Sequence, residues 1–130
     1  MISDKTLLAD LAALITADDP FARDASGRLF RYQGGVYVDG EFFLRQRVKH
    51  LLVQFQKSGK WTRKLAEEVR EFILLDAPEV LTRPSPSILN LENGLLDIGT
   101  QQLLPHSPQF RSTLRIPVSF RAGQSCPRIN

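Results

Sequence analysis

Residues 88–99 read Ile-Leu-Asn-Leu-Glu-Asn-Gly-Leu-Leu-Asp-Ile-Gly, and this stretch predicts a β-hairpin. Apolar residues stand on both sides of Asn93 and Gly94, and Asn-Gly is a favoured pair in two-residue hairpin turns. Such a type I′ turn needs a positive φ at both central residues, so we expect it at Asn93 and Gly94. The two strands should cover 88–91 and 95–98.

Further β-rich segments lie on both sides of this hairpin. Gly99 and Thr100 predict a turn into a third strand over 102–104. Residues 113–120 predict an edge or bulged strand, because Pro117 has no N–H to donate to a ladder. Upstream, Gln33-Gly34-Gly35 separates two more β-rich runs, which predict a second hairpin over 28–32 and 36–38.

Three amphipathic helices are predicted before residue 78. The first should begin at a Ser3 cap and end near Asp18. The second should cover about 41–57, where apolar residues recur at helical spacing along one stripe. Thr62 can cap the third, with Trp61 on its apolar side. The fold class is therefore α+β, with N-terminal helices and a β-hairpin followed by a small antiparallel β-meander.

Length and composition are those of one globular domain. The chain has 130 residues, of which 42% are hydrophobic and 24% charged. No apolar run reaches the roughly 20 residues that a membrane span needs, and the N-terminus lacks the basic start of a signal peptide. One cysteine cannot form an intrachain disulfide, so we expect a cytoplasmic setting.

The charge is unevenly distributed along the chain. Residues 1–27 carry two basic and five acidic side chains, whereas residues 41–70 carry eight basic and three acidic ones. A basic cluster indicates an anionic partner such as DNA, although a solvated helix face is the plainer interpretation. Trp61 could stack on bases, but its spacing from Leu65 favours a place in the core. The candidate DNA-binding residues are Arg45, Arg47, Lys49, Lys60, Arg63 and Lys64.

The sequence does not assemble a catalytic, cofactor or metal site. A phosphate-binding Walker loop would need a glycine where Gln54 stands and Ser or Thr in place of Trp61. The two histidines are far apart and belong to no Cys/His cluster. Asp39-Gly40-Glu41 has the spacing of a magnesium-binding acidic pair, but directly after a strand it favours a turn and a helix start.

An ordered series of motifs indicates a family. Residues 88–97 are followed by Gln-Leu-Leu-Pro-His-Ser-Pro at 102–108, Leu-Arg-Ile-Pro-Val at 114–118 and Cys-Pro-Arg at 126–128. With Tyr-Gln-Gly-Gly-Val-Tyr at 32–37, this series resembles the poxvirus-type primase-helicase N-terminal-like domain of the phage/plasmid primase family. Ile116 departs from that pattern, which has leucine there. The motif residues, which we expect to shape the fold, are Asn90, Asn93, Gly94, Asp97, His106, Ser107, Pro108, Pro117, Cys126 and Pro127.

The resemblance implies a non-catalytic module of a DNA replication primase-helicase that positions the helicase motor and contacts DNA. In that family the domain lies between a primase-type region and a superfamily 3 helicase core, which would bind ATP and magnesium. Expected partners are DNA, bound weakly without sequence preference, and the primase and helicase domains of the same polypeptide, as a possible hexamer. We expect an N-terminal helix over 1–20, the family domain over 21–120 and a linker towards a missing core over 121–130.

Two other interpretations remain open. The module could be a structural collar that assists ring assembly and has little DNA contact. It could also be a free-standing, winged-helix-like DNA-binding regulator, because helices followed by a hairpin permit that fold.

Overall fold

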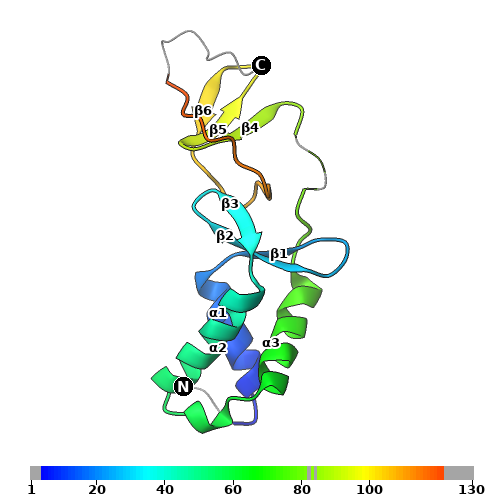
Figure 1. Cartoon of the computed structure of the whole chain (residues 1–130), viewed down its shortest axis with the longest axis vertical. Helices are drawn as coiled ribbons and strands as arrows, with labels where there is room; N and C mark the ends of the chain where they lie inside the picture. Colours follow the sequence, from blue (N-terminus) through cyan, green and yellow to red (C-terminus); the bar gives the residue numbers. More distant parts are fainter. Residues whose placement is uncertain (1–3, 82, 84, 122–130) are drawn as a thin grey trace.

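Three helices form one end of the molecule, and two small antiparallel sheets follow along its long axis (Figure 1). The computed structural model describes residues 4–81, 83 and 85–121. The expected α+β class is confirmed. In chain order the elements are α1 (Leu7–Asp18), β1 (Phe21–Arg23), β2 (Leu29–Gln33), β3 (Val36–Asp39), α2 (Glu41–Gln54), the 3₁₀ turn η1 (Ser58–Lys60), α3 (Arg63–Asp76), β4 (Ile88–Leu91), β5 (Gly94–Asp97) and β6 (Gln102–Leu104).

The three helices share one apolar core. The expected stripe of α2 is buried, with Phe55 packed partly against the same core. Trp61 also packs against it, as its spacing predicted. The Thr62 hydroxyl accepts a hydrogen bond from the Leu65 N–H at 2.9 Å, so the predicted cap of α3 is present. Side chains with no exposed surface at the centre of this core are Leu11, Ile15, Leu44, Leu52, Val48 and Val69.

The start of α1 differs from the prediction. The helix begins at Leu7 with Thr6 as its N-cap residue, so the cap expected at Ser3 is wrong, and Ser3 itself lies outside the described residues. The reason is tertiary: the Asp4 carboxylate accepts a hydrogen bond from Lys57 Nζ at 2.6 Å. That contact holds Asp4 against the end of α2 instead of in a first helical turn.

The first sheet has the order β1-β2-β3. The predicted hairpin is present, with Gln33 paired to Val36 and positive φ of 58° at Gly34 and 99° at Gly35. Strand β1 was not predicted, because its three residues are too few to show an alternating pattern. The chain after α3 runs beside β1, with the Val80 N–H bonded to the Arg23 carbonyl at 2.8 Å.

The second sheet, β4-β5-β6, is the predicted meander, but its first turn is shifted by one residue. Leu91 pairs with Gly94, so the two central turn residues are Glu92 and Asn93. The type I′ prediction at Asn93 and Gly94 is therefore wrong, since positive φ is found at Gly94 (151°) and not at Asn93. The Asn93 side chain is instead bonded to the Phe120 backbone, as donor at 2.7 Å and as acceptor at 3.0 Å.

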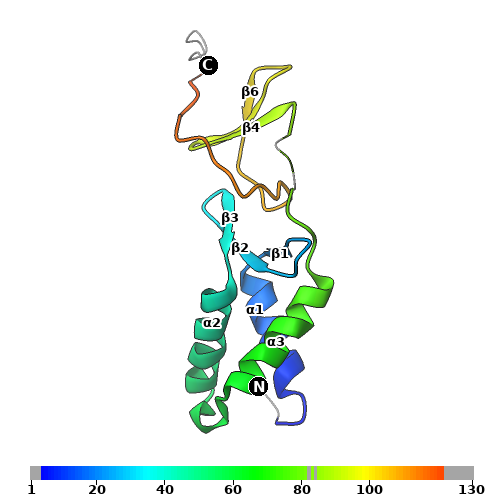
Figure 2. The ribbon, with the colours of Figure 1, turned by 45° about the vertical axis from the view of Figure 1, so that its right-hand side comes forward.

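Residues 113–120 form no strand. The single bridge is parallel and joins Ile116 to Leu91, so the predicted edge strand is wrong. Pro117 has no N–H, and the ladder cannot continue through it. The segment still covers one face of the second sheet, where Phe120 is buried against Leu91 and Leu96. Figure 2 shows this sheet at the end of the molecule away from the helices.

Candidate nucleic-acid interface

The fold separates the six basic candidates into different environments. Arg45 and Lys49 are exposed on α2. Arg47 lies on the side of α2 towards α1, where its Nη2 is 3.2 Å from an Asp18 carboxylate oxygen. Lys60 Nζ is 3.9 Å from Asp4. Arg63 and Lys64 are exposed at the start of α3.

Half of the basic charge of residues 41–70 is in ion pairs with acidic side chains. The acidic N-terminal segment supplies partners for Arg47, Lys57 and Lys60. The hydrogen bond from Lys57 lowers the pKa of the Asp4 carboxyl. Arg70, outside the candidate set, is bonded to Glu41. These cations are thus already partnered within the molecule.

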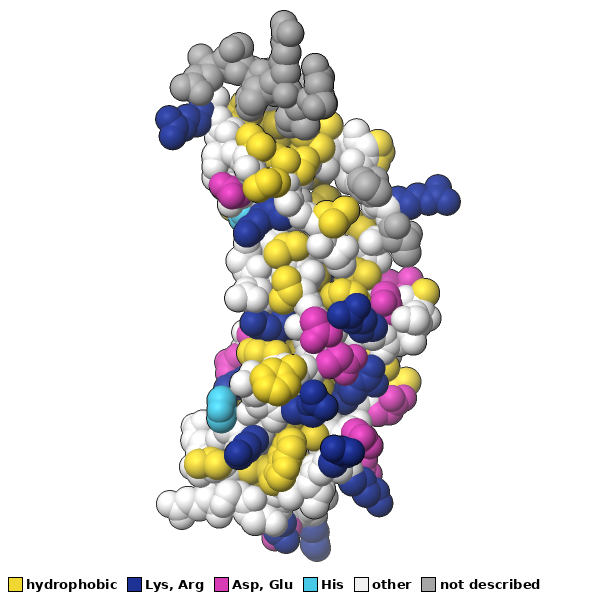
Figure 3. Space-filling model, viewed as in Figure 1, with side chains coloured by type: hydrophobic (Ala, Val, Ile, Leu, Met, Phe, Trp, Pro, Cys, Tyr) yellow, Lys and Arg dark blue, Asp and Glu magenta, His cyan; other side chains and the backbone are white. Residues whose placement is uncertain are grey.

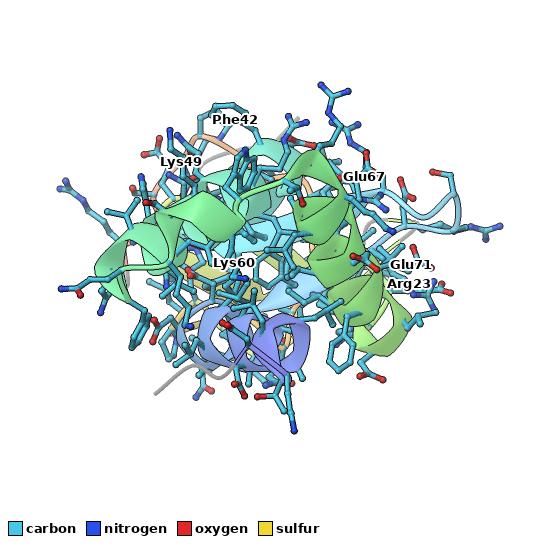
Figure 4. The ribbon with its side chains drawn as sticks, turned by 90° about the horizontal axis from the view of Figure 1, so that it is seen from below. Arg23, Phe42, Lys49, Lys60, Glu67 and Glu71 are labelled. Carbon is cyan, nitrogen blue, oxygen red and sulfur yellow. The ribbon has the colours of Figure 1, made fainter. Side chains whose placement is uncertain are left out.

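The exposed face of α2 differs from the rest of the helical end. Phe42, Arg45, Lys49 and Val53 recur at helical spacing outside the buried stripe, and the Phe42 side chain is 59% exposed. The Arg45 guanidinium carbon lies 5.7 Å from the centre of the Phe42 ring. Figure 4 shows Phe42 and Lys49 on the outer side of α2. The one acidic residue of α2, Glu41, is bonded to Arg70.

The exposed face of α3 is mixed in charge. Glu67 and Glu68 follow Arg63 and Lys64 by one helical turn, and Glu71 follows Glu67 in the same way. In the view of Figure 3, acidic and basic side chains are interspersed over α3, whereas basic and apolar ones alternate over α2. Phe42, Arg45 and Lys49 together form an exposed surface on α2, which we call the α2 face. Of the helical surfaces, the α2 face therefore has the chemistry most suited to an anion.

Sequence reasoning missed Phe42. The available signal was its position: an aromatic residue in α2 that falls outside the apolar stripe has no core to enter. Trp61, the aromatic residue that sequence reasoning considered for stacking, is packed against the core.

Glu41 and Arg70 form a partly buried, charge-assisted network that orders the start of α2. Arg70 Nη2 donates to a Glu41 carboxylate oxygen at 2.8 Å and to the Gly27 carbonyl at 2.7 Å. Glu41 also accepts the Leu29 N–H at 2.9 Å. Asp39-Gly40-Glu41 is therefore a turn and helix start, as expected, with its glutamate engaged by Arg70. The Arg70 hydrogen bond lowers the pKa of the Glu41 carboxyl.

This lowered pKa gives a pH prediction. A carboxyl whose pKa falls on folding stabilises the folded state above its unfolded pKa, and that contribution is lost as pH falls through the folded value. We expect Glu41→Gln to lower the free energy of unfolding by about 1–2 kcal/mol at neutral pH, and the difference from wild type to shrink below about pH 4. Urea unfolding across pH measures this. Glu67→Gln, which removes an exposed carboxylate of α3, is the control. If Glu41→Gln lost the same free energy of unfolding at every pH, the stabilising role of the ionised Glu41 carboxylate would be contradicted.

Two of the family-type motif residues, Asn90 and His106, lie at the joint between the two sheets. Asn90 is 6% exposed, and its Nδ2 donates to the carbonyls of Gly35 at 2.8 Å and Leu114 at 3.0 Å. His106 Nε2 lies 2.7 Å from the Leu91 carbonyl. A Cβ at Gly35 would come within 2.7 Å of the His106 ring, so this ring packs directly on the glycine turn.

Other motif residues make hydrogen bonds in nearby turns and connections. The Tyr37 hydroxyl donates to the Pro108 carbonyl at 2.6 Å, and Ser107 Oγ accepts the Gln109 N–H at 3.1 Å. Asp97 Oδ1 accepts the Gly99 N–H at 3.0 Å in the β5–β6 turn. The hydrogen bonds shown by these side chains are to backbone groups. Cys126 and Pro127 lie outside the described residues.

A hollow of about 470 Å³ lies between α1 and α3, with Ala12, Ala13, Phe72 and Ile73 in its lining. Its lining is mainly apolar, so it does not suit a phosphate. Within residues 4–81, 83 and 85–121, no three His, Cys, Asp or Glu side chains are grouped so as to hold a metal ion. None of the helices there is long and apolar enough to span a bilayer.

The comparison with protein families gives one match. The family model described as "D5 N terminal like" matches residues 23–130, which is most of the chain and includes β2 to β6, α2 and α3. No curated protein matches the chain. The match begins within β1 and therefore leaves α1 outside it, although α1 shares its core with α2 and α3.

Proposed function

From the membership of this chain in the D5 N terminal like family, we propose that it binds DNA and positions a helicase motor of the same polypeptide on that DNA. The family is a non-catalytic N-terminal domain family of replication primase-helicases. The observation that carries the DNA contact is the α2 face. There two exposed cations, Arg45 and Lys49, follow an exposed aromatic ring along one side of α2, whose single acid is paired with Arg70. On its side towards α3, Arg45 also lines a hollow with Glu67 and Glu71. Phosphate contacts of this kind bind DNA without reading its sequence.

Within this proposal the domain does no chemistry itself. ATP and magnesium would bind the helicase motor, and the primase and helicase domains, in a possible hexamer, would be its partners within the full-length protein. Of the six basic candidates, Arg45 and Lys49 would contact phosphates directly. Arg63 and Lys64 would contribute less, because Glu67 and Glu68 lie one turn away. Arg47 and Lys60 would mainly hold α1 and the N-terminal segment to the helical core.

We expect Arg45→Glu/Lys49→Glu to weaken DNA binding by on the order of tenfold or more at low salt. Each phosphate contact contributes about 0.7–0.9 to the slope of log affinity against log salt, so the double variant should also flatten that slope by about 1.5. Fluorescence anisotropy with a labelled DNA strand, from about 50 to 200 mM salt, measures both quantities.

The matched control is Arg63→Glu/Lys64→Glu, which changes the net charge equally but lies on α3. It should reduce affinity less than the α2 variant does. Equal losses in the two variants would mean that net charge alone governs binding. Absence of wild-type binding at low salt would overturn the DNA contact and favour the structural collar.

A further inference from the structure

Phe42 is an exposed aromatic ring in a cationic setting. Its side chain is 59% exposed on the first turn of α2, while its neighbour Phe43 turns inward and packs against the core. The Arg45 guanidinium approaches the Phe42 ring, and Lys49 lies on the outer side of the same helix (Figure 4). Phe42 therefore offers a largely exposed aromatic surface next to a cation that could contact a phosphate.

We propose that Phe42 stacks on an unpaired base, so that the α2 face binds single-stranded DNA in preference to duplex; this inference rests on the proposed DNA contact. In a duplex the faces of the bases are covered by their neighbours, and a side chain on a helix surface meets mainly phosphates. A single strand exposes base faces, and stacking on an aromatic side chain tolerates any sequence. Arg45 and Lys49 contact phosphates of the DNA backbone, and the Phe42 ring stacks on a neighbouring base.

The comparison with Phe72 shows why the surroundings of the ring matter. Phe72 is also substantially exposed, at 46%, but it lies on α3 beside the apolar hollow that Asp19 and Asp76 line. A phosphate there would meet carboxylates instead of cations. Exposure alone thus does not distinguish the two rings. They differ in that a cation, Arg45, lies at the Phe42 ring, although Arg45 also lines a hollow with Glu67 and Glu71 of α3.

The experiment compares wild type with Phe42→Ala, Phe42→Trp and Phe72→Ala, using a labelled oligo-dT strand and a duplex of the same length. We expect Phe42→Ala to lose about tenfold in affinity for the single strand and to change little for the duplex. Its salt slope should match that of wild type, because the phosphate contacts remain. Phe42→Trp should retain or strengthen single-strand binding, and Phe72→Ala should bind both probes as wild type does.

These outcomes separate the inference from the proposed function. Equal losses for strand and duplex in Phe42→Ala, or no loss in either, would overturn base stacking while leaving the phosphate contact intact. Loss of single-strand binding in Phe72→Ala would mean that the aromatic ring in contact with DNA lies on α3 and not on α2. If wild type binds neither probe, the DNA contact itself fails. Far-UV circular dichroism of each variant establishes that the helices are retained.

Discussion

Gly94→Ala is expected to lower the free energy of unfolding by about 3 kcal/mol, the largest stability effect of any single methyl group added to the second sheet. Gly94 has a φ of 151°, which residues with a side chain rarely adopt. A Cβ there would also overlap the Leu104 carbonyl oxygen on β6, and Leu103 Cδ1 lies 3.1 Å away. Because the obstacle includes backbone of a paired strand, it cannot rotate aside.

The control for this prediction is Gly99→Ala in the neighbouring turn. Gly99 has no positive φ, and its closest atom to a new Cβ is Asp97 Oδ1 at 3.5 Å, so the change should stay within about 0.5 kcal/mol. Urea unfolding followed by far-UV circular dichroism and by Trp61 fluorescence measures the sheet and the helical core together. Equal stability of the two glycine variants would show that the contact between β5 and β6 is looser than described.

Asn90→Ala is expected to lower the free energy of unfolding by about 1–3 kcal/mol, because it leaves the buried Gly35 carbonyl without its donor. It also removes the hydrogen bond to the Leu114 carbonyl, which keeps the Ser112 hydroxyl as a donor. The Asn90 Oδ1 atom is buried without a partner among the described residues, so its removal loses no hydrogen bond. The cost therefore reports the two Nδ2 hydrogen bonds, of which the one to Gly35 joins the first sheet to the second and the one to Leu114 holds the chain after β6 against β4.

The location of the loss tests this prediction further. Hydrogen exchange should speed up most at amides of β4–β6, with a smaller change in the helices, because the joint links two separately packed cores. Gln102→Ala, which removes an exposed amide from β6, should exchange as wild type does. A uniform loss of protection throughout Asn90→Ala would mean that the two sheets unfold as one unit with the helices.

Local patterns were sufficient for most elements. The stripe of α2, the cap at Thr62, the first hairpin and the two strands of the second follow from residue spacing and turn residues, which act over a few positions. Prediction failed where a distant group intervened. Asp4 bonds to Lys57 instead of entering α1, and the Asn93 side chain is bonded to the Phe120 backbone in a turn one residue earlier than expected.

By itself the sequence determined the class of the fold, the family motifs and the presence of a basic region after an acidic one. Tertiary structure decided which of those charges face solvent, because an ion pair depends on distance in space and not along the chain. Arg47 meets Asp18 from 29 residues away, and Lys57 meets Asp4 from 53, while Arg45 and Lys49 remain exposed. The same packing placed Trp61 against the core and left Phe42 outside it, which is why the candidate DNA contact is the α2 face.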